Sequence, residues 1–104
     1  MATRYKIRFE RDAESDLRDL WTYIARESPA RADRFVLDLV GRCERLADFP
    51  GVGRPLSGAR PNVKVVSYRR RATIAYELKG DVLLVRRILY KGRDQAALLL
   101  LLDD

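Results

Sequence analysis

The chain opens with a strict alternation of polar and apolar side chains. The apolar positions are Tyr5, Ile7 and Phe9, and the polar positions between them are Arg4, Lys6, Arg8 and Glu10. A period of two places successive side chains on opposite sides of a strand. The pattern therefore predicts a β-strand over Arg4–Glu10 with one face in a core.

The apolar period then lengthens to that of an amphipathic helix, twice in succession. The first stripe comprises Ala13, Leu17, Leu20, Trp21, Ile24 and Ala25. The second stripe comprises Ala32, Phe35, Val36, Leu39, Val40, Cys43, Leu46 and Ala47. Asp12 suits the N-cap of the first helix, and Ser28-Pro29 suits the cap and first position of the second. Because few residues join the helices, we expect an antiparallel hairpin whose stripes face a common neighbour.

The second half of the chain is typical of strands and turns. Residues Asp48–Asn62 hold so many prolines and glycines that the segment predicts a loop. Three strands follow, at Val63–Tyr68, Arg71–Leu78 and Val82–Tyr90, with a turn at Lys79-Gly80-Asp81. Residues Gln95–Leu102 suggest a short C-terminal helix, in which Leu98–Leu102 is apolar on all sides and either rests on the core or contacts a partner.

This order of elements predicts an α+β fold. A strand, a two-helix hairpin and a three-stranded antiparallel meander give a sheet with the helices packed on one face. The opposite face is expected to be open and rich in Arg. The length of 104 residues is that of one ordinary domain, so we expect a single domain over residues 1–104.

The last predicted strand combines an apolar run with two adjacent arginines, Arg86 and Arg87. Successive strand side chains point to opposite faces, so the two arginines are expected to do so. A buried Arg without a partner is costly, so each needs a partner or an open face. Glu77 on the neighbouring strand is placed to satisfy one of them. At least one of the pair is therefore a candidate binding residue.

The net charge of +6 belongs to the second half of the chain. Residues 1–53 are balanced, whereas residues 54–93 carry an excess of nine positive charges, most of them Arg. Arginine favours planar, bidentate contacts to phosphate or carboxylate. The excess predicts a nucleic acid or an acidic protein as partner. The run Arg69–Arg71 is the densest part of it, and its alternative role is that of a solvated turn.

Several chemistries are disfavoured by composition. With one Cys, no internal disulfide is expected, which fits a reducing cytoplasm. One Cys and no His argue against a zinc site, so we expect no metal, and they remove the commonest general base. We expect no cofactor. No signal peptide or membrane span is visible, because Leu98–Leu102 is far shorter than the roughly 20 residues that a span needs.

An ordered set of stretches resembles the toxins of the RelE/ParE superfamily, and more closely the ParE (plasmid stabilisation) branch. The matching stretches are Ala13–Ala25, Ser28–Phe35, Leu46–Pro55, Ile74–Tyr76 and Arg87–Asp94. The resemblance implies the toxin of a type II toxin–antitoxin pair, masked by an acidic or amphipathic ParD-like antitoxin. ParE-branch toxins typically act on DNA gyrase and block replication by binding. RelE-branch toxins cut mRNA in the ribosome.

Two sets of site residues follow from these expectations. For a toxin that acts by binding, the residues expected to contact the target, the antitoxin or nucleic acid within the target complex are Arg69, Arg70, Arg71, Arg86, Arg87, Lys91 and Arg93. For a ribosome-dependent endoribonuclease, the residues expected around the scissile phosphate are Arg87, Tyr90, Lys91 and Arg93.

The first set is favoured, with no catalytic residue. Many relatives carry His where Tyr90 stands, and Tyr is a poorer base at neutral pH because its pKa is about 10. A non-toxic relative that only binds an antitoxin is a third alternative.

Overall fold

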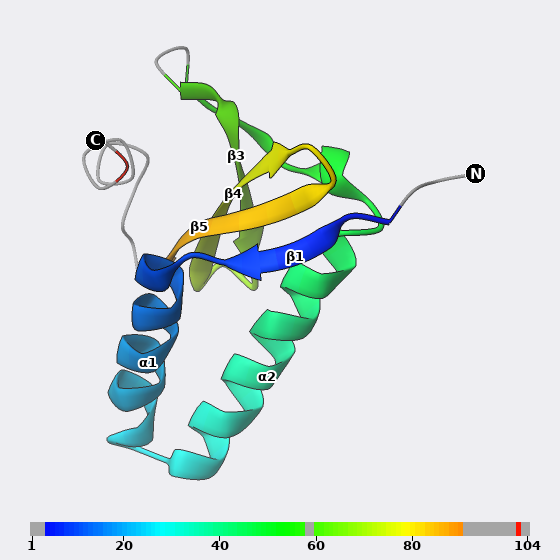
Figure 1. The fold of residues 1–104 in the computed structure, drawn as a ribbon. Helices are drawn as coiled ribbons and strands as arrows, with labels where there is room; N and C mark the ends of the chain where they lie inside the picture. Colours follow the sequence, from blue (N-terminus) through cyan, green and yellow to red (C-terminus); the bar gives the residue numbers. More distant parts are fainter. Residues whose placement is uncertain (1–3, 58–59, 91–101, 103–104) are drawn as a thin grey trace.

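The computed structural model describes residues 4–57, 60–90 and 102 (Figure 1). Its elements are β1 (Lys6–Phe9), α1 (Arg11–Ala25), α2 (Pro29–Leu46), a 3-10 turn η1 (Pro50–Val52), β2 (Arg54–Ser57), β3 (Arg60–Tyr68), β4 (Ala72–Lys79) and β5 (Val82–Tyr90). The five strands form one sheet in the order β1-β5-β4-β3-β2. Only the β1–β5 pair is parallel. With both helices on one face of the sheet, the predicted α+β architecture is confirmed (Figure 1).

The two helices begin in different ways. Ser28 caps α2 as predicted, because its Oγ accepts a hydrogen bond from the Arg31 N–H at 3.2 Å and Pro29 follows it. The prediction of Asp12 as the N-cap of α1 is wrong, since α1 begins at Arg11 and Glu10 holds the cap position without a side-chain cap. The Glu10 N–H bonds to the Val85 carbonyl at 3.0 Å, so the end of β1 leads directly into the helix.

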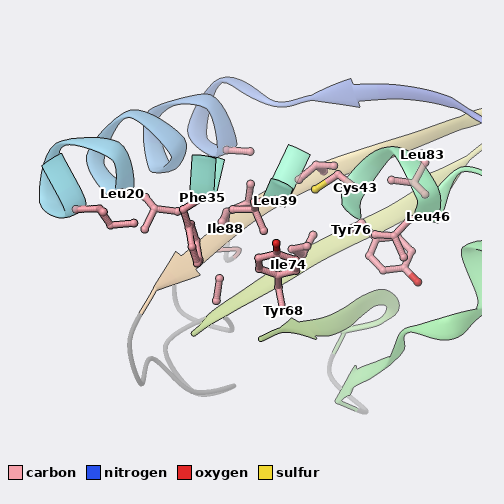
Figure 2. Packing of buried hydrophobic residues seen from close by; sticks show 14 of the residues in the cluster. Leu20, Phe35, Leu39, Cys43, Leu46, Tyr68, Ile74, Tyr76, Leu83 and Ile88 are labelled. Carbon is pink, nitrogen blue, oxygen red and sulfur yellow. The ribbon is translucent and has the colours of Figure 1, made fainter. Parts of the chain in front are cut away.

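The main core lies between the helices and the sheet (Figure 2). The predicted helical stripes supply Leu20, Ile24, Phe35, Leu39, Cys43 and Leu46, and the sheet supplies Tyr68, Ile74, Tyr76, Leu83, Val85 and Ile88. Cys43 is fully buried in this layer, and burial raises the pKa of its thiol to about 12. The thiolate is the reactive form of cysteine. Cys43 is therefore an inert core residue, as its position on the stripe predicts.

The predicted loop over Asp48–Asn62 contains regular structure, so this prediction is wrong in part. Pro50–Val52 form η1, Arg54–Ser57 form β2, and β3 begins at Arg60 instead of Val63. The Tyr76 hydroxyl organises the segment from inside the core: it accepts the Gly53 N–H at 2.9 Å and donates to the Pro50 carbonyl at 2.7 Å. A Cβ on Gly53 would lie 2.5 Å from the Tyr76 oxygen, so the close approach requires glycine.

The face of the sheet opposite the helices is not open, which corrects the expectation of an exposed Arg-rich face. A second apolar cluster buries Leu56, Val63, Val65, Ala75, Leu89 and Leu102. The sheet is wider than predicted because β2 joins it, and Leu56 of that strand is buried there. Leu102 also packs in this cluster, which favours the core-facing alternative for that residue. Residues 95–101, and with them the predicted C-terminal helix, lie outside the described residues.

Candidate functional site

Arg86 and Arg87 lie at a β-bulge in β5. Tyr76 of β4 pairs with Val85 and Ala75 pairs with Arg87, so β5 holds one extra residue at this point. A bulge interrupts the alternation of side chains. Val85 and Ile88, on either side of it, both pack into the core beneath the helices. The prediction that Arg86 and Arg87 point to opposite faces assumed strict alternation along the strand. The bulge shows that β5 does not alternate strictly at this point.

Arg87 is bound to the first helix. Its Nε and Nη2 donate to the two carboxylate oxygens of Asp16, each at 2.8 Å. Asp16 Oδ2 also accepts the Ile88 N–H at 2.9 Å, at the part of β5 that β1 does not pair with. The side chains of Arg87 and Asp16 are only 16% and 10% exposed. The hydrogen bonds to Asp16 raise the pKa of Arg87, although burial opposes them. Arg87 thus joins α1 to the sheet.

Arg86 is bound to two carboxylates. Its Nε lies 3.0 Å from Glu10 Oε1, and its Nη1 contacts Glu77 Oε2 on the neighbouring strand. The predicted pairing with Glu77 is confirmed for Arg86. This arginine is also largely buried, so its charge is neutralised within the fold. Arg86 and Arg87 therefore both form ion pairs within the fold.

Arg69–Arg71 connect β3 to β4, and Arg69 and Arg70 are the two central residues of a tight turn. The φ angles of Arg69 and Arg70 are 50° and 57°, and the Arg71 N–H donates to the Tyr68 carbonyl at 2.9 Å. This is the geometry of a type I′ turn, which favours Asn and Gly at both central positions. The left-handed conformation costs a residue with a Cβ roughly 1–2 kcal/mol. Arg69 and Arg70 therefore adopt this backbone conformation at a cost in conformational free energy.

The three arginines of the turn have different surroundings. Arg69 Nη2 lies 3.5 Å from Asp38 on α2, and its guanidinium stacks 5.1 Å from the centre of the Tyr68 ring. Arg70 and Arg71 are exposed and make no ion pair with the described residues. Their side chains are therefore available to a ligand.

Arg70 and Arg71 line an open cleft of about 810 Å³, here called the arginine cleft. Its walls come from the end of α1, the α1–α2 turn, the first turns of α2, the β3–β4 turn and the end of β5. They comprise Tyr23, Ile24, Arg26, Glu27, Arg31, Phe35, Arg70, Arg71 and Tyr90. Arg26 and Arg31 were not expected there, because the balanced charge of the first half draws no attention to them. Their positions on either side of Ser28-Pro29 are the sequence signal that identifies them as a basic pair at the hairpin tip.

Tyr90 belongs to an aromatic group in this cleft. Its ring centre lies 5.5 Å from that of Tyr23 and 5.8 Å from that of Phe35, in edge-to-face geometry. Tyr90 and Arg87 also line a smaller cleft of about 360 Å³ between α1 and β5, which contains Asp16 and Asp19. Arg87 in this cleft is already paired with Asp16, and Asp19 adds a further negative charge, so this smaller cleft is a poor site for a phosphate and for RNA cleavage.

The remaining expected site residues are not placed by the structure. Lys91 and Arg93 lie outside the described residues. Within residues 4–57, 60–90 and 102, no group of three or more potential ligands is positioned to hold a metal ion. In the same part of the chain, neither helix combines the length and apolar character that a membrane span requires.

Comparison with known structures found chains of similar fold, two of which come from toxin–antitoxin systems. The chromosomal ParDE toxin–antitoxin system from P. aeruginosa superimposes with a TM-score of 0.74 at 24% identity, over 86% of this chain and 99% of that chain. The toxin–antitoxin complex RelBE2 from Mycobacterium tuberculosis gives 0.66 at 20% identity, over 85% and 99%. A conserved hypothetical protein from Helicobacter pylori gives 0.56 at 17%, over 83% and 93%. At these low identities, the TM-scores establish similarity of fold alone.

Comparison with curated protein sequences gave no match. The family model of the ParE toxin of the type II toxin–antitoxin system parDE matches residues 7–95, which is most of the chain and includes the arginine cleft. The resemblance noted in the helices, the Leu46–Pro55 segment and the last strand is thereby confirmed. This chain belongs to the ParE toxin family of type II toxin–antitoxin systems.

Proposed function

We propose that this protein is the toxin of a ParDE-type pair and that it inhibits DNA gyrase by binding, without catalysing a reaction. The observation that carries the proposal is the division of its arginines. Arg86 and Arg87 are held in ion pairs, whereas Arg70 and Arg71 are exposed beside Arg26 and Arg31 in one cleft. A dense group of uncompensated cations suits a large anionic target.

The alternative of RNA cleavage has less support. Arg87, which would steady a phosphate, donates both of its described hydrogen bonds to Asp16. Tyr90 packs against two other aromatic rings, and no acid–base partner for it is described. A general base needs a partner that positions it and tunes its pKa. The described geometry therefore favours a binding protein.

The same arginines are the proposed target of the antitoxin. The P. aeruginosa and M. tuberculosis neighbours are described as toxin–antitoxin systems, which supports a partner of this kind for the present chain. An acidic, ParD-like segment lying across the helical hairpin would neutralise Arg26, Arg31, Arg70 and Arg71. Trp21 and Leu37 are exposed apolar side chains of the hairpin that suit the apolar face of such a segment.

The proposal is tested with supercoiled plasmid, purified gyrase and ATP, with protein denaturation and digestion before the gel. Linear DNA that requires gyrase and is suppressed by the antitoxin is the expected result. Absence of linear DNA and of any loss of supercoiling, from protein that arrests growth, would contradict the proposal. In that case cleaved mRNA on purified ribosomes would identify an endoribonuclease. Absence of growth arrest would identify a relative that only binds its antitoxin.

Arg70→Asn separates the binding role of this residue from its effect on stability. Asn accepts the left-handed backbone of Arg70, so the variant is expected to fold with a free energy of unfolding equal to or up to about 1 kcal/mol above that of the wild type. Its gyrase-dependent linear DNA is expected to fall severalfold. Arg8→Ala, an exposed arginine on β1, is the matched control. Wild-type activity in Arg70→Asn would exclude Arg70 from the contact.

A further inference from the structure

The arginine cleft holds more positive charge than the fold needs. Arg26, Arg31, Arg70 and Arg71 reach it from two turns and one helix, and Glu27 is the one acidic residue among the described lining residues. None of the four arginines forms an ion pair with any described residue. Arg4, Arg69, Arg86 and Arg87 do have carboxylate partners. Other described arginines also lack an ion pair with a described residue, but they lie outside this cleft: Arg8, Arg11, Arg18, Arg34, Arg42, Arg45 and Arg54. The cleft is distinguished because four such arginines converge on one concave surface.

One feature of the backbone increases this positive potential. Arg31 lies in the first turn of α2, which holds no acidic residue, and the positive end of a helix dipole disfavours a cation there. This arrangement is unfavourable for the isolated protein, and a bound anion would offset the repulsion. The expected anion carries several charges within a short distance.

The aromatic residues that line the cleft indicate which chemical group accompanies the negative charges of the ligand. Tyr23 is 42% exposed, Tyr90 is half-buried, and the buried Phe35 packs against Tyr90. Tyrosine rings in a basic groove are the platform on which unpaired bases stack, while arginines contact the phosphates between them. A duplex keeps its bases inside its own stack, so it would use the arginines without the tyrosines. The volume of about 810 Å³ lies in the range of sites for small ligands, roughly 300–1,000 Å³, and suits only a few nucleotides.

We infer that the arginine cleft binds a short stretch of single-stranded nucleic acid, with the phosphates on Arg26, Arg31, Arg70 and Arg71 and a base against Tyr23. The inference deepens the proposed function, on which its biological setting rests, since a gyrase complex contains cleaved DNA. The toxin would then contact the DNA component of its target directly. An acidic antitoxin segment would compete for the same arginines.

The test uses the purified toxin and a fluorescein-labelled octathymidylate, with anisotropy measured over a series of salt concentrations. For a single strand, the slope of log K against log salt is about −0.7 per phosphate neutralised, so four contacts give about −2.8. Arg26→Ala is expected to reduce the magnitude of the slope by about 0.7. Arg8→Ala, outside the cleft, is expected to leave the slope unchanged.

Tyr23→Leu tests the stacking contact separately from the charge. It keeps an apolar side chain but removes the ring, so the affinity is expected to fall about tenfold with no change in the salt slope. A general loss of structure would alter both quantities, and circular dichroism of the variant checks its fold. Equal affinity of Tyr23→Leu and wild type would overturn the role of the ring.

Two competitors decide the class of ligand. A blunt duplex of the same sequence length and a polyglutamate of equal charge are both expected to compete at least tenfold more weakly than unlabelled octathymidylate. Equal competition by the duplex would overturn the single-strand inference. Equal competition by polyglutamate would assign the cleft to an acidic protein segment instead.

The oligonucleotide-binding test and the gyrase assay can give independent results. Linear DNA formed by a toxin that does not bind the oligonucleotide would overturn the cleft inference and leave the proposed function in place. Oligonucleotide binding without gyrase-dependent linear DNA would overturn the proposed function and leave the cleft as a nucleic-acid site.

Discussion

Asp16→Ala is the substitution that most directly tests how the sheet and the first helix are held together. The Asp16 carboxylate accepts three hydrogen bonds: two from the Arg87 guanidinium, at 2.8 Å each, and one from the Ile88 N–H, at 2.9 Å. Alanine removes all three. It leaves the Arg87 charge and a backbone donor without their partner at a part of β5 that β1 does not pair with.

The expected loss of stability is set by the burial of this pair. Hydrogen bonds to charged groups contribute about 1.5–3 kcal/mol each, but they are not additive here because they share one carboxylate. Removing one partner of a buried ion pair costs about 3–5 kcal/mol. Asp16 and Arg87 are 10% and 16% exposed, so some water reaches them and the lower end applies, about 3 kcal/mol. For a domain of this size, that loss lowers Tm by roughly 12–24 °C.

Urea denaturation followed by far-UV circular dichroism measures the free energy of unfolding. Asp38→Ala is the matched control, because its pair with Arg69 is longer, at 3.5 Å, and both side chains are far more exposed. That control is expected to change stability by less than about 0.5 kcal/mol. Equal stability of Asp16→Ala and Asp38→Ala would refute the reasoning.

A double variant distinguishes a lost ion pair from a disturbed helix. Asp16→Ala combined with Arg87→Met removes both charges and keeps most of the apolar length of the arginine. It is expected to be more stable than Asp16→Ala alone, because no charge is left without a partner. Strictly additive losses in the two single variants would mean that the pair is not coupled.

Two further substitutions probe the interior. Tyr76→Phe is expected to lower the free energy of unfolding by about 1–3 kcal/mol, because the Gly53 N–H and the Pro50 carbonyl lose their buried partner; an unchanged urea midpoint would contradict this account of the Pro50–Val52 turn. Burial raises the pKa of the Cys43 thiol from 9.0 to about 12, so the folded state keeps a proton that the unfolded chain loses above pH 9. Between pH 8 and pH 10 the free energy of unfolding of the wild type is therefore expected to fall by about 1.4 kcal/mol more than that of Cys43→Ala. Parallel curves of unfolding free energy against pH for the two proteins would argue against this effect of Cys43.

Most of the regular elements could be predicted from local pattern. The predicted strand over Val82–Tyr90 has the bounds of β5, and the predicted strand over Arg71–Leu78 differs from β4 by one residue at each end. The helical hairpin follows from its two apolar stripes and from Ser28-Pro29. These features depend on periodicity, caps and turns, which act between residues close in the sequence.

The elements that were missed depend on distant partners. β2 contains Pro55 and lies in a segment rich in proline and glycine, and it forms because β3 pairs with it while Tyr76 holds the preceding turn. The second apolar cluster was missed for the same reason, since the prediction lacked the strand that supplies Leu56. No local pattern in Asp48–Asn62 indicates these contacts.

The sequence by itself determined where the charges lie along the chain, including the basic second half and the Arg69–Arg71 turn. Only the tertiary structure decided which of those charges are free. Arg87 is 71 positions from the Asp16 that neutralises it, whereas Arg70 meets Arg26 and Arg31 in a cleft that offers no carboxylate partner among the described residues except Glu27. Charge is a property of each residue, but pairing depends on distances of a few ångströms that folding alone sets.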